Sequence, residues 1–86
     1  RYLGFCEGAL ALVAEHHGRR LRYLVAADHP ELDRVNAPLL HIAHRQRSLR
    51  VETINERPLR DSPYLAALER QLLLTRDHKQ WYLMPR

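Results

Sequence analysis

The residues best suited to chemistry in this 86-residue sequence are its arginines, which make up thirteen of the fourteen basic residues. Three lie on an expected hairpin, three where an expected helix joins a strand, and two in an expected turn, so all eight are expected at the surface. A guanidinium group exposed at such a place can meet a phosphate without a desolvation conflict. The candidates for nucleic-acid contact are Arg19, Arg20, Arg22, Arg45, Arg47, Arg50, Arg57 and Arg60. The alternative is ordinary solvated charge, which is the default for surface arginines.

The overall charge favours a phosphate backbone or an acidic partner surface, because the formal net charge is +4 and the isoelectric point is near 9.8. A basic surface without a partner remains the alternative, since the net charge of one small domain decides little. Four aromatic side chains are candidates for stacking on bases: Tyr23, Tyr64, Trp81 and Tyr82. Trp81 and Tyr82 are neighbours in an expected last strand, so one of the two is expected to face the core.

Six histidines raise the hypothesis of a metal site. His41 and His44 lie three residues apart on an expected helix, and His16 and His17 lie at the first hairpin. Structural zinc takes four nitrogen or sulfur ligands, and Cys6 is the only cysteine, so scattered carboxylates would have to complete the site. We therefore expect surface histidines and no metal.

No residue pattern in the chain points to catalysis. The paired carboxylates Glu52 and Glu56 fall at a strand end and a turn, without a sign of a pocket. Ser48 and Ser62 lack the context of a nucleophile elbow, and Ser62 is better explained as a helix cap. The glycines stand only at positions 4, 8 and 18, so a G-x-x-x-x-G-K-[ST] phosphate loop is absent. We expect no catalytic residue and no bound cofactor in this segment.

Residues 8–27 predict a β-hairpin that turns around Gly18, where a tight turn needs a positive φ. The first strand is apolar on both faces and is expected to be central or covered. The second alternates apolar residues with Arg20 and Arg22, which are expected to point outward. The segment before this hairpin, residues 1–7, has no clear period.

Residues 28–50 predict a helix that Pro38 interrupts, because proline in a helix interior removes a backbone hydrogen bond. Asp28 or His29 is expected to cap the start, with Pro30 in the first turn. Apolar residues at 32, 35, 39 and 42 form one stripe. Asn36 is placed to cap a second segment, so we expect a kink or two short helices.

The stretch 48–68 combines a strand at 49–53, a turn at 55–58 closed by Pro58, and a helix starting at Asp61-Ser62-Pro63. Residues 72–76 and 80–84 predict a closing hairpin. The order ββαβαββ predicts an α+β fold. We expect a small, mostly antiparallel sheet of about five strands and two helices. Such a sheet would be compatible with being part of a β-barrel-like module.

This order of elements resembles the C-terminal part of the core of Lhr-type (large helicase-related) superfamily 2 DNA helicases, which include the ligase-associated DEXH-box branch. In that family a strand ends in a hydrophobic residue and Asn-Gly, with a proline two residues on, then Ser-Pro or Ser-x and a helix. The matching residues are Ile54, Asn55, Pro58, Ser62, Pro63, Leu65 and Leu68. The resemblance covers residues 8–84, with two departures. Glu56 replaces the usual Gly, which favours a different turn type, and Gln71-Leu72 replaces a Gly-Phe.

The resemblance implies a parent enzyme that moves 3′-to-5′ on single-stranded DNA and binds ATP and Mg²⁺ in other domains. Residues 1–86 would then be a single accessory domain of a longer, cytoplasmic chain. Its partners would be single-stranded DNA and the other domains of the same helicase, and not a membrane. Its role would be to position the DNA strand or to brace the motor domains.

A second hypothesis is a protein-interaction module that docks through an apolar sheet face and does not contact nucleic acid. The apolar strand 9–14 and the leucine run 72–74 carry more apolar surface than a small core is expected to absorb. The run 9–14 is also the longest apolar one and is too short to span a bilayer. The single cysteine excludes an internal disulfide and fits a reducing cytoplasm.

Overall fold

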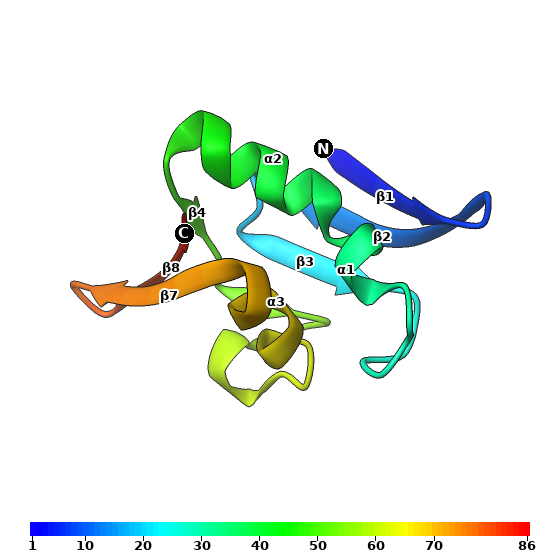
Figure 1. Cartoon of the computed structure of the whole chain (residues 1–86). Coiled ribbons are helices and arrows are strands. Elements are labelled where there is room, and N and C mark those ends of the chain that lie inside the picture. Colours follow the sequence, from blue (N-terminus) through cyan, green and yellow to red (C-terminus); the bar gives the residue numbers. More distant parts are fainter.

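The computed structural model describes all 86 residues as an α+β fold in which two sheets share one core (Figure 1). The five-stranded sheet has the order β1 (Tyr2–Cys6), β2 (Ala9–Glu15), β3 (Arg20–Tyr23), β5 (Thr53–Ile54) and β6 (Arg57–Pro58). The three-stranded sheet has the order β4 (Leu49–Arg50), β8 (Gln80–Pro85) and β7 (Leu72–Asp77). All pairs are antiparallel except β3 with β5. The α+β prediction is therefore confirmed, but the strands are more numerous and do not close into a barrel.

Two predicted hairpins are confirmed, and an unpredicted strand joins the first. Strand β2 pairs with β3, and β7 pairs with β8, each across a short turn. Strand β2 is central, as its two apolar faces predicted, because residues 1–7 supply β1 on its other side. Gly4 is buried inside β1, where an added Cβ would lie 2.7 Å from the Val35 carbonyl oxygen. The end of α1 therefore packs closely against β1, on the inner face of this sheet.

Pro38 divides the predicted helix in two. Helix α1 (Leu32–Val35) ends just before Asn36, and α2 (Ala37–Gln46) has Pro38 in its first turn, where the missing N–H costs no helical bond. The predicted cap is wrong: the Asn36 side chain makes no cap bond and instead accepts the Tyr23 hydroxyl, at 2.6 Å. At the start of α1 the side chain that helps is His29, whose Nδ1 accepts the Glu31 N–H at 3.0 Å.

The predicted strand 49–53 is two strands that belong to different sheets. Strand β4 pairs with β8, and β5 pairs with β3 and β6. Between them the chain crosses from one sheet to the other at the buried Val51. The alternation of apolar residues cannot distinguish one continuous strand from two short strands in different sheets. In both cases the same residues point into the core.

The proline turn leads into a short 3-10 helix, η1 (Leu59–Asp61), and then α3 (Leu65–Gln71). Ser62 Oγ accepts the Tyr64 N–H at 3.1 Å, so this serine organises the approach to α3 as a turn residue. Asn55 and Glu56 have φ values of 51° and 69°, and a type I′ turn requires a positive φ at both positions. Glu56 therefore adopts the backbone that a glycine there would adopt, and the expected change of turn type is not seen.

Candidate nucleic-acid interface

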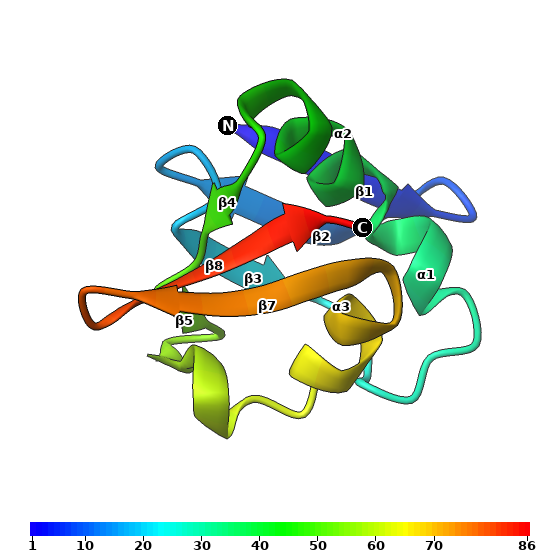
Figure 2. The ribbon, with the colours of Figure 1, turned by 60° about the vertical axis from the view of Figure 1, so that its left-hand side comes forward.

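Backbone hydrogen bonds around residues 50–52 gather segments that are far apart in the sequence. The Glu52 N–H donates to the Arg19 carbonyl at 2.8 Å, and the Val51 N–H donates to the Trp81 carbonyl at 3.2 Å. The Leu59 N–H donates to the Glu52 carbonyl at 3.2 Å. The β2–β3 turn, η1 and β8 therefore meet around residues 50–52, on the left side of Figure 2, where the α2–β4 join leads into β4. We call this side the basic end, after the arginines that its segments carry: Arg19, Arg47, Arg50, Arg60 and Arg76.

Two arginines of the basic end lie against Trp81. The guanidinium carbons of Arg60 and Arg76 are 4.9 Å and 5.3 Å from the centroid of its ring, within cation–π range. Trp81 is half-buried and packs against the core, whereas Tyr82 has the opposite orientation in β8, as predicted for this pair. Arg76 was not among the predicted residues. The register of the last hairpin pairs Arg76 with Trp81, and this pairing would have identified Arg76 as a candidate.

Arg47 adopts a backbone conformation that glycine usually occupies. It follows α2 with a φ of 69°, a left-handed conformation in which glycine is preferred. Three residues later Arg50 lies 3.2 Å from the Glu52 carboxylate, while its buried Nε has no partner. Seven other non-glycine residues in the turns of this chain also have a positive φ, so the conformation of Arg47 marks the end of α2 and not by itself a site.

The structure does not bring all eight predicted arginines together. Arg20 and Arg22 lie on the outer face of the five-stranded sheet, and Arg22 is paired with Glu56 at 2.5 Å. Arg45, on the last turn of α2, lines a hollow with Tyr2 and His41, and Arg57 lies on the edge strand β6. Four of the eight therefore belong to the basic end: Arg19, Arg47, Arg50 and Arg60.

Two of the predicted stacking residues are used by the fold itself. The Tyr23 and Tyr64 rings stack on each other with centroids 4.2 Å apart and an interplanar angle of 3°. Tyr23 is buried, and this burial raises the pKa of its hydroxyl well above the ordinary value. Neighbouring Tyr64 raises that pKa further, while the hydrogen bond to Asn36 lowers it. Tyr23 is therefore unavailable to a nucleic-acid base.

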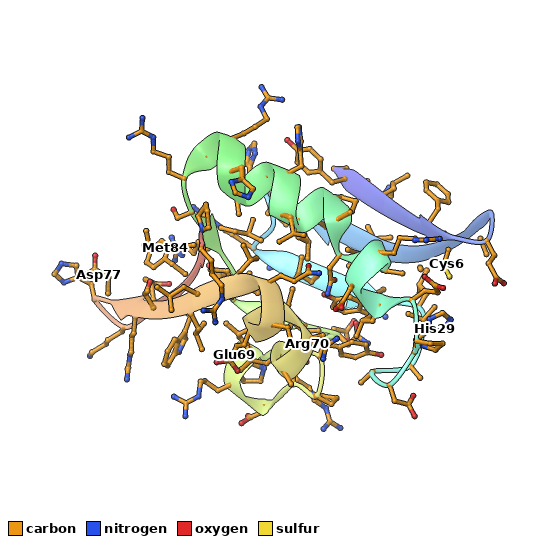
Figure 3. The ribbon with its side chains drawn as sticks, in the orientation of Figure 1. Cys6, His29, Glu69, Arg70, Asp77 and Met84 are labelled. Carbon is orange, nitrogen blue, oxygen red and sulfur yellow. The ribbon has the colours of Figure 1, made fainter.

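The metal-ligating side chains do not gather into a site, since no group of three or more His, Cys, Asp or Glu residues comes together. Figure 3 shows Cys6 beside His29, with Cys6 Sγ 4.0 Å from His29 Nε2. Because Nδ1 accepts the Glu31 N–H, the neutral ring carries its proton on Nε2 and donates it toward the sulfur. This pair fixes the loop before α1 against β1.

Compared with known proteins, the chain matches no family model, and no curated protein or solved structure is significantly similar to it. None of its helices has the length and apolar character needed to cross a membrane.

Proposed function

We propose that this chain is an accessory domain of an ATP-dependent DNA helicase of the Lhr type, and that its basic end positions single-stranded DNA. ATP and Mg²⁺ would be bound by other domains of the parent chain. The observation that carries the proposal is that five segments on one side of the molecule each carry an arginine: the β2–β3 turn, the α2–β4 join, β4, η1 and β7. Guanidinium groups spaced along one side of a domain can contact several phosphates of a strand. The resemblance carried by Ile54, Asn55, Pro58, Ser62 and Pro63 supports the same assignment.

The binding test is a fluorescence-polarisation titration of labelled oligothymidine with the chain, repeated across salt concentrations. The double variant Arg19→Ala/Arg47→Ala is expected to bind roughly tenfold more weakly, with a salt slope lower by about 1.4, because two phosphate contacts are lost. The control Arg34→Ala/Arg70→Ala removes the same charge from α1 and α3 and is expected to change the affinity less than about twofold. Binding that is undetectable at low salt, or independent of salt, would exclude DNA contact.

A single substitution separates binding from folding at the same site. Arg47→Gly removes a guanidinium group and relieves the left-handed backbone, so we expect weaker DNA binding together with a free energy of unfolding raised by about 1 kcal/mol. If Arg47 served only the fold, Arg47→Gly would lower the free energy of unfolding and leave DNA binding unchanged.

A second candidate function is docking on a protein surface, because the outer face of the five-stranded sheet exposes a group of large apolar side chains. Leu3, Phe5, Leu10 and Leu24 are 44%, 55%, 38% and 52% exposed. The register pairs Phe5 with Leu10, which lie next to each other across β1 and β2. We call these four residues the apolar face. It differs from the predicted patch, since Ala11–Ala14 and Leu72 are buried.

The apolar face is tested with a dye that fluoresces on exposed apolar surface and with light scattering. The double variant Phe5→Ser/Leu24→Ser is expected to lose most of the dye signal of the natural chain and to keep its affinity for oligothymidine. A natural chain that is a monodisperse monomer and binds no dye would argue against docking through this face.

A further inference from the structure

One indole ring holds two guanidinium groups that come from different parts of the chain. The register of the last hairpin pairs Arg76 on β7 with Trp81 on β8, so these two side chains lie on the same face of the three-stranded sheet. Arg60 reaches the same ring from η1, and both guanidinium carbons lie within cation–π range of its centroid. Trp81 in turn packs against the core, so the ring is a fixed support for both arginines.

Neither of these exposed arginines has an anionic partner. Five other arginines of the chain form ion pairs with carboxylates, whereas Arg60 and Arg76 form no ion pair and no side-chain hydrogen bond. Asp77, next to Arg76 in the chain, lies at the tip of the β7–β8 turn (Figure 3), 3.4 Å from His78 Nε2. Asp61, next to Arg60, is exposed and forms no ion pair. Two positive charges at one ring repel each other, so an anion from outside the chain would stabilise the pair.

Resting on the function proposed above, we propose that Arg60 and Arg76 together bind one phosphate of single-stranded DNA, with Trp81 holding both guanidinium groups in place. A phosphodiester group has two unesterified oxygens, and each can accept hydrogen bonds from one guanidinium. Both side chains already lie against the ring, so they lose less conformational entropy on binding than two freely moving arginines would lose. The site recognises the phosphate and does not read the base.

The backbone places this phosphate site next to another free arginine of the basic end. The Leu59 N–H donates to the Glu52 carbonyl at 3.2 Å, and the Glu52 N–H donates to the Arg19 carbonyl at 2.8 Å. These bonds fix η1, and with it Arg60, beside the β2–β3 turn that carries Arg19. A strand that extends from the site toward this turn meets a second guanidinium without an ion pair, whereas a lone phosphate ion would use the first site only. A strand with several phosphates is therefore the occupant that the arrangement favours.

Trp81 is the only tryptophan of the chain, so its fluorescence reports directly on this site. Its emission is followed while the natural chain is titrated with oligothymidine, with an abasic oligonucleotide of equal length, and with inorganic phosphate. Both oligonucleotides should change the emission to a similar extent, because they carry the same phosphates. Inorganic phosphate should leave the emission unchanged at the concentrations at which the oligonucleotides saturate.

The arginines are tested in polarisation titrations of labelled oligothymidine across salt concentrations. Arg60→Ala/Arg76→Ala is expected to bind roughly tenfold more weakly, with a salt slope lower by about 0.7, because both arginines act on one phosphate. This is half the change in slope expected for Arg19→Ala/Arg47→Ala, which removes contacts with two phosphates. A slope lower by about 1.4 would mean that Arg60 and Arg76 each contact a phosphate of their own, and would contradict a shared site.

Three further results would overturn the assignment. If Arg60→Ala/Arg76→Ala binds oligothymidine as tightly as the natural chain while Arg19→Ala/Arg47→Ala is weakened, the phosphate site is wrong and the basic end still binds DNA. If oligothymidine changes the Trp81 emission but the abasic strand does not, a base and not a phosphate contacts this site. If inorganic phosphate saturates the emission change at the same concentrations as oligothymidine, the ligand is a free phosphate and not DNA. A chain that binds neither oligonucleotide would instead remove the proposed function itself.

Discussion

Replacing Gly18 with alanine is expected to lower the free energy of unfolding by about 2–4 kcal/mol, a large part of the stability of a domain of this size. Gly18 has a φ of +93°, in which side chains are strained. An added Cβ would also lie 2.2 Å from Leu49 Cδ1 and 3.2 Å from its Cγ. Leu49 is fully buried between the two sheets, so its whole side chain would have to move. Equilibrium unfolding in urea measures the loss.

Gly8 provides a matched control for this prediction. It has a φ of +82° in the β1–β2 turn, and no atom lies within 4 Å of an added Cβ. Gly8→Ala should therefore cost only the backbone strain, about 1–2 kcal/mol. The difference between the two variants measures the contact with Leu49. Equal losses would show that the β2–β3 turn does not hold β4 in place.

The features of the fold that could be predicted from the sequence are those that residues close together in the chain determine. The turn at Gly18 and the break at Pro38 act within a few residues, and both predictions are confirmed. Strand β1 had no such signal, since Gly4 interrupts its pattern and the register shifts between Gly4 and Phe5. The split of residues 49–53 between two sheets depends on β3 and β8, whose paired residues lie 32 to 34 positions away, before and after this segment.

The candidate site shows the same limit. The sequence could locate arginines in turns and joins, but the neutralisation of Arg22 depends on Glu56, 34 residues later. The inclusion of Arg76 depends on the register of the last hairpin and on Trp81. Spacing along the chain predicts which side chains reach the surface, whereas tertiary contacts decide which of them share one surface and which are already paired.

The second large effect is expected for Tyr23→Phe, which should lower the free energy of unfolding by about 1–3 kcal/mol at neutral pH. The Tyr23 hydroxyl donates to Asn36 Oδ1 at 2.6 Å, and the buried Asn36 Nδ2 makes no hydrogen bond. Phenylalanine would keep the stacking on Tyr64 but leave both polar atoms of a buried amide without a partner. Thermal and urea unfolding measure the change. Asn36→Leu combined with Tyr23→Phe is the control, because removing both polar partners should restore part of the loss.

The natural chain and Tyr23→Phe should also differ in how stability depends on pH. The unfolded chain ionises Tyr23 near pH 10, whereas burial keeps the folded hydroxyl protonated to a higher pH. The folded state therefore binds more protons above about pH 10, and the contribution of Tyr23 is complete below that pH and declines as the pH rises toward its folded pKa. The stability difference between the two chains should be constant from pH 7 to about 9 and shrink above about 10, by at most about 1.4 kcal/mol per pH unit. A difference that stayed constant through pH 11 would mean that the Tyr23 hydroxyl ionises as readily in the folded chain as in the unfolded one, and would contradict its burial against Asn36 and Tyr64.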